Sequence, residues 1–402
     1  MKKFAKKVVA AILGYQVRQL KKRNNFKVVG VVGSIGKTST KLAIAQTLGA
    51  SFKVRYQDGN YNDLVSVPLV IFDESLPSLM NPLAWLAVFM RNQKKLNDYP
   101  YEVVVLELGS DGPGQIAQFK KYLQLEIGVI TAITPEHMAF FGTLDGVAKE
   151  ELAISQFSTF ILANGDLCDK KYLTQKSNLL TYGLHGGADY GVEQIGNVGD
   201  DKSQAEQYSL IAAAAVGGEL GMEAKDIQAG LAKVGPVPGR MQILKGINNS
   251  VLIDDTYNAS PVAVKLALDY LYSLDAPKRI AVLGNMNEFG DSSKTAHEVV
   301  GAYCDPKKLD LVLTVGPDAN IYLAEAAEAK GCKVQTFDNP YAAGEYLKPL
   351  LQKGDTVLVK GSQNGVFAEE IVKILLANPA DSDKLVRQSD YWLKIKQKAF
   401  KR

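Results

Sequence analysis

Residues 26–48 read FKVVGVVGSIGKTSTKLAIAQTL and carry the clearest fold signal of the chain. Its first part is rich in β-branched residues and predicts a strand over Phe26–Val32, and Thr38–Leu48 has a helical pattern. Between them lies Gly33–Ser39, GSIGKTS. Glycines let backbone N–H groups approach phosphate oxygens, and the N-terminus of the following helix favours an anion. Strand, glycine turn and helix together predict a phosphate-binding loop, a variant of GxxxxGK[ST] with Val31 in place of the first glycine.

The whole loop is a candidate nucleotide site: Gly33, Ser34, Ile35, Gly36, Lys37, Thr38 and Ser39. Lys37 is expected to reach the β- and γ-phosphates of ATP, and the hydroxyl of Thr38 or Ser39 is expected to hold Mg²⁺. The alternative is a chance glycine turn, which the strand–turn–helix context disfavours.

The chain is too long, at 402 residues, for one compact core. Strand candidates alternate with helical stretches on both sides of a break at residues 236–239 (PVPG). This alternation predicts an α/β protein with a parallel-sheet ATP-binding domain and a smaller Rossmann-like C-terminal domain. We place a basic amphipathic segment at residues 1–25, the ATP-binding domain at 26–235, the C-terminal domain at 236–380 and a basic tail at 381–402. The expected elements are strands at residues 103–106, 127–133, 251–253, 280–283, 311–315 and 356–359, and helices at 210–220, 261–273 and 367–376.

Composition narrows the function classes. A net charge of only +3 does not indicate a general nucleic-acid binder. The three cysteines are far apart and form no CxxC pair, which excludes a zinc ribbon and favours a reducing cytoplasm. We expect a cytoplasmic monomer.

Two segments raise the question of a membrane. Residues 1–25 hold basic clusters around a short apolar run, Val8–Leu13, that is too short to span a bilayer. Such a helix either packs as a solvated helix on the first domain or makes weak peripheral contact with the inner face of the membrane. The apolar stretch Asn81–Met90 is more typical of a core helix than of a membrane contact.

Three further features are weak evidence for a functional site when each is taken alone. Glu107 ends a buried strand and is well placed for a metal ion, although a capping carboxylate is an equal alternative. His137 is one of three histidines, and a lone histidine is usually structural. Glu150 and Glu151 are also typical of a solvated helix face.

Together these pieces resemble the Mur ligase family, above all its D-alanyl-D-alanine-adding ligases. The resemblance covers about residues 26–375. It is carried by residues 33–39, 107–109, 113–116 (PGQI), 137, 141–143 (FGT), 236–240 (PVPGR), 254–261 (DDTYNASP), 283–286 (LGNM) and 360–362 (KGS).

The resemblance implies ATP-dependent amide-bond formation through an acyl phosphate on a peptidoglycan-precursor carboxylate, with an amine such as D-Ala-D-Ala. It implies that Glu107 and His137 bind Mg²⁺ and that Arg240 contacts the γ-phosphate. Asp255, Tyr257 and Asn258 fall in the motif that closes over the nucleotide. Catalysis is thus expected from Lys37, Glu107, His137, Glu151 and Arg240, and metal binding from Thr38, Glu107, His137 and Glu151.

The chain departs from the family pattern in four places. The basic segment 1–25 stands where the family has its UDP-sugar-binding domain. Glu151 occupies the position of the family's carbamylated lysine. The stretch 205–209 (AEQYS) replaces His-Asn-x-x-Asn, and Gln363 replaces an arginine. Alternative functions are therefore a ligase for a polyglutamate or lipid-linked acceptor, a non-catalytic ATP-binding regulator, or a plain P-loop NTPase or kinase. The motif at residues 255–261 disfavours the last.

Overall fold

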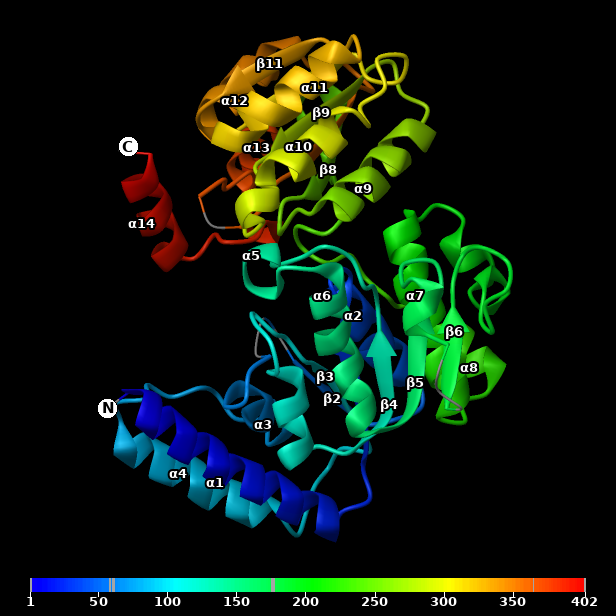
Figure 1. Cartoon of the computed structure of the whole chain (residues 1–402), viewed down its shortest axis with the longest axis vertical. Coiled ribbons are helices and arrows are strands. Elements are labelled where there is room, and N and C mark those ends of the chain that lie inside the picture. The colour runs from blue at the N-terminus through cyan, green and yellow to red at the C-terminus, as the bar shows by residue number, and fades with distance from the viewer. Residues whose placement is uncertain (1, 58, 60–61, 175–177, 364, 401–402) are drawn as a thin grey trace. The chain divides into compact units, whose positions relative to one another are not determined.

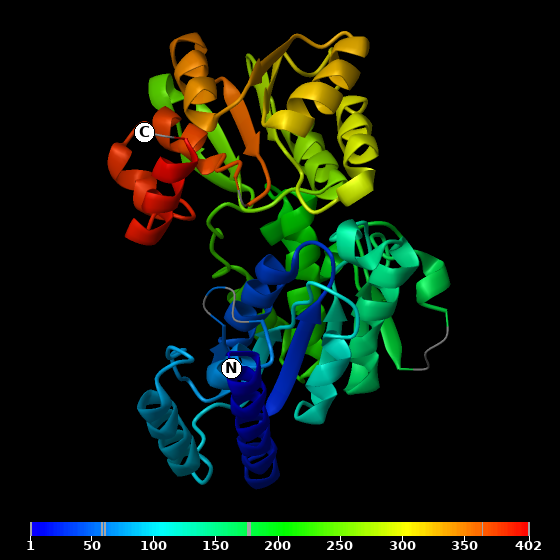
Figure 2. The ribbon, with the colours of Figure 1, turned by 60° about the vertical axis from the view of Figure 1, so that its left-hand side comes forward.

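The computed structural model describes residues 2–57, 59, 62–174, 178–363 and 365–400. The chain forms two compact units, which are described separately. Unit 1 comprises residues 1–134, 140–202 and 206–234, and unit 2 comprises residues 135–139, 203–205 and 235–402. Figures 1 and 2 show the ribbon of both.

Unit 1 is built on a six-stranded parallel sheet of order β2-β3-β1-β4-β5-β6. The strands are β1 (Lys27–Val32), β2 (Val54–Tyr56), β3 (Val103–Glu107), β4 (Leu125–Ile130), β5 (Ser158–Asn164) and β6 (Leu179–Tyr182). After β1, the chain places β2 and β3 on one side of it and then β4, β5 and β6 on the other side. The carboxyl end of β1 is therefore the topological switch point, where open α/β sheets bind ligands.

Helices cover both faces of this sheet, as expected for a parallel sheet. Val28 and Val104 pack into a core with α1 and α3, whereas their strand neighbours Val29 and Val105 pack into a core with α2, α7 and α8. The helices are α1 (Lys2–Arg23), α2 (Lys37–Leu48), α3 (Ser66–Ile71), α4 (Pro82–Lys95), α6 (Leu144–Glu151), α7 (Gln204–Glu219) and α8 (Ala224–Leu231). A short helix, α5 (Met138–Phe141), joins residues assigned to different units.

The N-terminal basic segment forms α1, which packs on unit 1 through Leu13, Val17 and Leu20. The apolar stretch Asn81–Met90 forms the first part of α4, with Trp85 buried. Several of its other apolar side chains are exposed, so the expectation of a core helix holds for one face only. Among the described residues, none of the helices is long and apolar enough to cross a bilayer.

Unit 2 has a second six-stranded sheet, of order β11-β10-β9-β12-β8-β7. Its strands are β7 (Gln242–Lys245), β8 (Val251–Asp255), β9 (Arg279–Gly284), β10 (Leu311–Val315), β11 (Val334–Phe337) and β12 (Thr356–Lys360). Only the edge pair, β7 with β8, is antiparallel. The helices are α9 (Pro261–Ser273), α10 (Ser293–Gly301), α11 (Ala324–Ala329), α12 (Pro340–Leu347), α13 (Glu369–Leu375) and α14 (Asp390–Ala399). The sheet therefore has the α/β character that the sequence predicts, with one mixed edge.

The C-terminal basic segment is folded rather than trailing. It contains α14, in which Lys396 is buried and bonds to Glu369 and Glu370 of α13, at 2.8 Å and 2.6 Å. Phe400 packs edge-on against Phe367 and Tyr341. Buried ion pairs and aromatic contacts thus attach this segment to unit 2.

Candidate active site

The phosphate loop follows β1 directly, and two glycines give it its shape. Gly33 has φ +129°, and a Cβ there would lie 2.2 Å from the Thr131 hydroxyl oxygen and 2.8 Å from the backbone nitrogen of Ala132. Gly36 has φ +81° and precedes the first residue of α2, Lys37. Both backbone conformations disfavour any residue with a side chain. The chain therefore turns sharply enough for the N-terminus of α2 to point outward beyond β1.

The loop is fixed to the residues that follow β4. The backbone nitrogen of Ser34 donates to the carbonyl of Ala132 at 3.0 Å, and the Ser34 hydroxyl accepts from the backbone nitrogen of Thr134 at 2.9 Å. Thr131 donates its hydroxyl to the carbonyl of Ile35 at 2.5 Å. These bonds engage the Ser34 hydroxyl within the protein, so what Ser34 presents to a nucleotide is its backbone.

Lys37, Thr38 and Glu107 come together at the mouth of this loop. The Lys37 ammonium donates to the carbonyl of Gly33, and the Thr38 hydroxyl donates to Glu107 Oε2 at 2.9 Å. Glu107 ends β3, which is the neighbour of β1, so the register of the two strands sets this contact. A lysine, a hydroxyl and a carboxylate thus meet at the switch point.

Two buried side chains that sequence reasoning missed hold Glu107 in place. Lys41, which is fully buried on α2, lies 3.6 Å from Glu107 Oε2. The Gln57 side chain donates to the backbone carbonyl of Glu107 at 3.0 Å and accepts from its backbone nitrogen. Lys41 is one helical turn after Lys37, and that spacing was the available signal. Nothing in the sequence around Gln57 marks it.

The stretch 205–209, which departs from the family pattern, lies inside α7, because this helix begins at Gln204 and not at the predicted residue 210. The Ser209 hydroxyl lies 3.2 Å from the hydroxyl of Thr40 on α2, and both residues are buried. This serine therefore packs α7 against the helix that begins at the phosphate loop.

The two acidic residues at the end of α6 differ in their surroundings. Glu150 is buried and accepts from the backbone nitrogens of Gly114 and Ile116, the latter at 2.7 Å. It therefore fixes the loop before the short 3₁₀ helix Ile116–Lys121. Glu151 is buried near Cys168, whose thiol has its pKa raised to about 12 by burial, with a further contribution from the Glu151 charge. Lys149 is exposed.

His137 lies in the part of the chain that packs with unit 2. Its Nδ1 is 2.7 Å from Glu288 Oε2, and its Nε2 is 3.7 Å from Glu136 Oε1. The hydrogen bond with His137 lowers the pKa of the Glu288 carboxyl. Both residues have positive φ, 49° and 70°, a conformation that is uncommon for residues with a side chain. The structure thus brings Lys37, Thr38 and Glu107 together in unit 1 and places His137 beside Glu288.

In unit 2, the predicted motif residues gather at the carboxyl ends of β8 and β12. Asp255 pairs with the buried ammonium of Lys360, which also donates to the carbonyl of Asn258 at 3.0 Å. Asp254 accepts from the Thr256 hydroxyl at 2.6 Å. Burial raises the pKa of Asp254 to about 6. Lys360, which the sequence analysis included only in a motif, therefore fixes the turn that carries Asn258.

Two arginines lie close to the ring of Tyr257, which belongs to the same motif. The Arg240 guanidinium is 4.2 Å from the ring centroid of Tyr257, and that of Arg387 is 5.8 Å away. Arg387 also donates to the carbonyls of Thr256 and Tyr257, at 2.6 Å and 3.2 Å. No motif signals Arg387 in the sequence.

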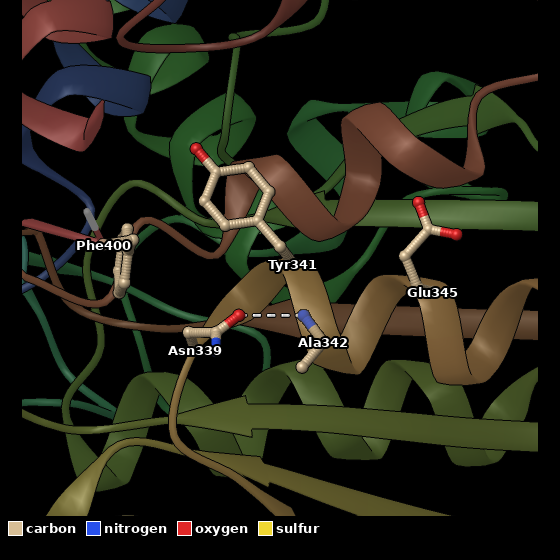
Figure 3. A pocket seen from close by; sticks show the side chains of 5 residues that line it. All are labelled: Asn339, Tyr341, Ala342, Glu345 and Phe400. Atoms are coloured by element: carbon tan, nitrogen blue, oxygen red, sulfur yellow. Dashed lines mark hydrogen bonds between the residues drawn. The ribbon is translucent and has the colours of Figure 1, made fainter. Parts of the chain in front are cut away.

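Unit 2 also contains Gln363, which departs from the family pattern, and a hollow at the start of α12. The backbone carbonyl of Gln363 accepts from the Asn287 side chain at 2.7 Å. A hollow of about 290 Å³ lies at the start of α12, and Figure 3 shows the side chains that line it. None of these residues is a predicted site residue. Asn339 there accepts from the backbone nitrogen of Ala342 at 2.9 Å, so the helix end is already capped.

The donor set in unit 1 suits magnesium. Hydroxyl and carboxylate oxygens are the ligands that Mg²⁺ prefers, usually one or two of them together with phosphate oxygens and water. Thr38 supplies a hydroxyl oxygen and Glu107 a carboxylate oxygen, and these two atoms are 2.9 Å apart. Among the described residues, no group of three or more His, Cys, Asp or Glu is arranged to hold a metal ion without a nucleotide. A site with few protein ligands fits a metal that arrives with ATP.

Comparison with known proteins decides the family. The Mur ligase middle domain matches residues 31–216, and the Mur ligase glutamate ligase domain matches residues 239–363. A UDP-N-acetylmuramoyl-tripeptide–D-alanyl-D-alanine ligase of Synechocystis is 30% identical over 375 residues, 89% of this chain and 77% of the relative. The chain belongs to the Mur ligase family. It is an ATP-dependent amide-bond-forming ligase of that family, so the expectation of a ligase is confirmed.

Two further relatives agree. The enzyme of the same name from Bacillus subtilis is 29% identical over 384 residues, 88% of this chain and 76% of its own. The crystal structure of MurF ligase from Thermotoga maritima in complex with ADP has a TM-score of 0.73 and 25% identity, and the match covers 91% of this chain and 83% of that one. This Mur ligase is therefore similar to MurF-type ligases in both units. The alternatives of a plain NTPase, a kinase or a non-catalytic regulator are set aside.

Proposed function

We propose that this Mur ligase joins D-Ala-D-Ala, or a similar amine, to the carboxylate of a peptidoglycan-precursor peptide through an acyl phosphate. The observation that carries the proposal is the preformed loop with Lys37, Thr38 and Glu107 at its mouth, in a chain similar to ligases named for that reaction. The choice of acceptor rests on that similarity alone. A polyglutamate or lipid-linked acceptor is the competing choice.

The proposed chemistry has two steps. A carboxylate oxygen of the acceptor attacks the γ-phosphorus of ATP, the bond to the bridging oxygen breaks, and ADP leaves. The amine then attacks the acyl carbon, inorganic phosphate leaves, and the amine nitrogen loses a proton. Charge builds up on phosphate oxygens in the first step, and preorganised positive groups lower that barrier. Lys37, the backbone N–H groups of residues 33–38, and Arg240 are the proposed positive groups.

Mg²⁺, when bound with ATP, would neutralise phosphate charge. Thr38 and Glu107 are the proposed ligands in unit 1, and Lys41 and Gln57 hold Glu107 in position for that role. His137 is a further proposed ligand, since a metal-binding histidine usually has its other ring nitrogen held by a carboxylate, here that of Glu288. Asp255, Tyr257 and Asn258 are proposed nucleotide contacts of unit 2.

Glu151 is proposed to replace the carbamylated lysine of the family with a permanent carboxylate. Its burial, beside the exposure of Lys149, supports the choice, because residues two apart on a helix point in nearly opposite directions. Activity should therefore not respond to bicarbonate. Glu151→Gln should lose much of its rate, because an amide offers a metal less negative charge. Rescue of the CO₂-depleted wild type by bicarbonate would show that a carbamylated lysine operates instead.

The function is tested by incubating the protein with ATP, D-Ala-D-Ala and one candidate acceptor at a time. The acceptors are UDP-N-acetylmuramoyl-tripeptide, a polyglutamate and a lipid-linked precursor. Product mass identifies the acceptor. Lys37→Ala should lower the rate by roughly 10²–10³, while Lys225→Ala, which changes an exposed lysine of the same unit, serves as the control. Product from another acceptor alone would overturn the proposed substrate. Near-normal turnover of Lys37→Ala would overturn the assignment of the loop.

A further inference from the structure

Exposed apolar side chains are concentrated on one part of unit 1. Of the 17 large apolar side chains that are exposed in the described part of the chain, eight belong to α1, α4 and the loop before α4. The other nine are scattered over the rest of the sequence. The eight are Val8, Ile12, Tyr15, Leu76, Met80, Leu83, Leu86 and Met90, with exposed fractions from 38% to 76%. Scattered apolar residues need no explanation, whereas a contiguous patch marks a contact surface.

The two helices lie side by side and run in the same direction. Figures 1 and 2 both show α1 next to α4. Gln16 donates to the carbonyl of Phe89 at 2.9 Å and accepts from Asn92 at 3.0 Å. Directly after the last residues of the two helices, Asn24 donates to the carbonyl of Leu96 at 2.8 Å. These contacts fix the register of one helix against the other.

With this register, each exposed apolar residue of α1 lies at about the same height along the helix pair as one exposed apolar residue of α4. Val8, Ile12 and Tyr15 follow the spacing i, i+4, i+7 on α1, and Leu83, Leu86 and Met90 follow i, i+3, i+7 on α4. Each set therefore forms one stripe along its helix. Ile12 is one turn before Gln16, and Leu86 is one turn before Phe89, so each stripe includes a residue one turn from a contact between the helices. We call these six residues the apolar strip.

The charged residues on the two helices themselves have one sign. Helix α1 contains eight basic residues and no acidic one, and α4 contains three basic residues and no acidic one. Some of these cations are neutralised: Lys6 pairs with Asp63, and Arg91 and Lys95 pair with Glu74. Lys7, Lys22 and Lys94 are exposed. An apolar strip inside a basic border complements a surface with negatively charged head groups over hydrocarbon.

We propose that the paired helices α1 and α4 dock this Mur ligase on an anionic lipid bilayer, with the apolar strip entering the head-group region. The helices lie on the bilayer rather than through it, since none of the described helices meets the length and hydropathy of a span. Tyr15 suits the head-group region, because its ring is apolar and its hydroxyl can form hydrogen bonds with water. The docking goes beyond the ligase reaction and does not depend on which acceptor is used.

The test is co-sedimentation of the full chain with vesicles of phosphatidylcholine alone and with vesicles containing an equal share of phosphatidylglycerol. We expect binding to the anionic vesicles, weakened by salt. The triple variant Leu83→Gln, Leu86→Gln, Met90→Gln should bind at least tenfold less. The matched control changes three exposed apolar residues of unit 2: Ile243→Gln, Val299→Gln and Ile321→Gln.

A second pair of variants separates charge from apolar contact. Lys7→Gln, Lys22→Gln, Lys94→Gln should lose binding mostly to anionic vesicles, while the unit 2 control Lys307→Gln, Lys330→Gln, Lys348→Gln should bind like the wild type. Ligase activity on a soluble acceptor should be unchanged in all four variants, and this also shows that each is folded.

Three results would overturn the proposal. They are absence of binding to anionic vesicles, unchanged binding of the strip variant, and equal binding to both kinds of vesicle. A doubled mass in light scattering that the strip variant restores to one chain would likewise overturn it, because the strip would then join two copies of the protein.

Discussion

The most demanding prediction concerns Glu369, the central carboxylate of a buried ion cluster in unit 2. Glu369 has no exposed surface and accepts from Arg387 at both oxygens, at 2.9 Å and 2.8 Å, while Lys396 lies 2.8 Å from one of them. Glu369→Ala removes the anion and leaves two cations in a region from which water is excluded. Such a charge is far more costly inside a protein than on its surface.

Removing one partner of a buried ion pair costs about 3–5 kcal/mol. We expect a cost at the lower end of this range for Glu369→Ala. The reason is that Lys396 still pairs with Glu370, and Arg387 still donates to the carbonyls of Thr256 and Tyr257. With a urea dependence of about 2 kcal/mol per molar, a loss of about 3 kcal/mol lowers the midpoint by roughly 1.5 M.

The two tryptophans allow the units to be followed separately. Trp85 is buried in unit 1, and Trp392 contacts Phe367 in unit 2. In a Trp85→Phe background, urea unfolding followed by fluorescence therefore reports on unit 2. The control is Glu345→Ala, an exposed carboxylate of the same unit. It should change the free energy of unfolding by less than about 0.5 kcal/mol. A Glu369→Ala midpoint equal to that of this control would show that Glu369 does not stabilise unit 2.

Two further predictions test the loop and a buried carboxyl. Gly33→Ala should abolish ATP binding, measured by calorimetry, because its Cβ would clash with Thr131 in a backbone conformation that alanine avoids; binding at wild-type affinity would contradict it. Asp254 has its pKa raised by burial from 3.8 to about 6, so it contributes stability that is fully present below pH 3.8 and is lost as the pH rises through 6. Asp254→Asn keeps an acceptor for Thr256 and should match the wild type at pH 4 but exceed it at pH 8 by up to about 3 kcal/mol of unfolding free energy; a constant difference between the two pH values would contradict this.

The sequence predicts the elements best where local signals and tertiary structure agree. The predicted helix at residues 261–273 and the predicted strand at residues 311–315 have the observed bounds, since proline opens the helix and apolar residues fill the strand. The predicted strand at residues 127–133 is instead Leu125–Ile130. The apolar residues after Ile130 leave the sheet because Thr131 and Ala132 bond to the phosphate loop.

Side chains that act through a neighbour were harder to predict. Gln57 is 50 positions from the glutamate whose backbone it holds, and its sequence surroundings carry no pattern. Lys360 was visible as part of a motif, but its pairing with Asp255 follows from the register of β12 against β8. Pairing across strands depends on topology, which one-dimensional periodicity does not encode.

The C-terminal segment shows why a family match and a functional unit need not end together. The matched range ends at residue 363, yet Arg387 donates to the backbone of Thr256 and Tyr257, inside the motif that the match includes. Arg387 is in turn held by Glu369, and Lys396 of α14 completes the cluster. The conformation of the motif therefore depends on residues beyond the matched range. Since Arg240 contacts the ring of the same Tyr257, the position of that arginine also depends on the C-terminal segment.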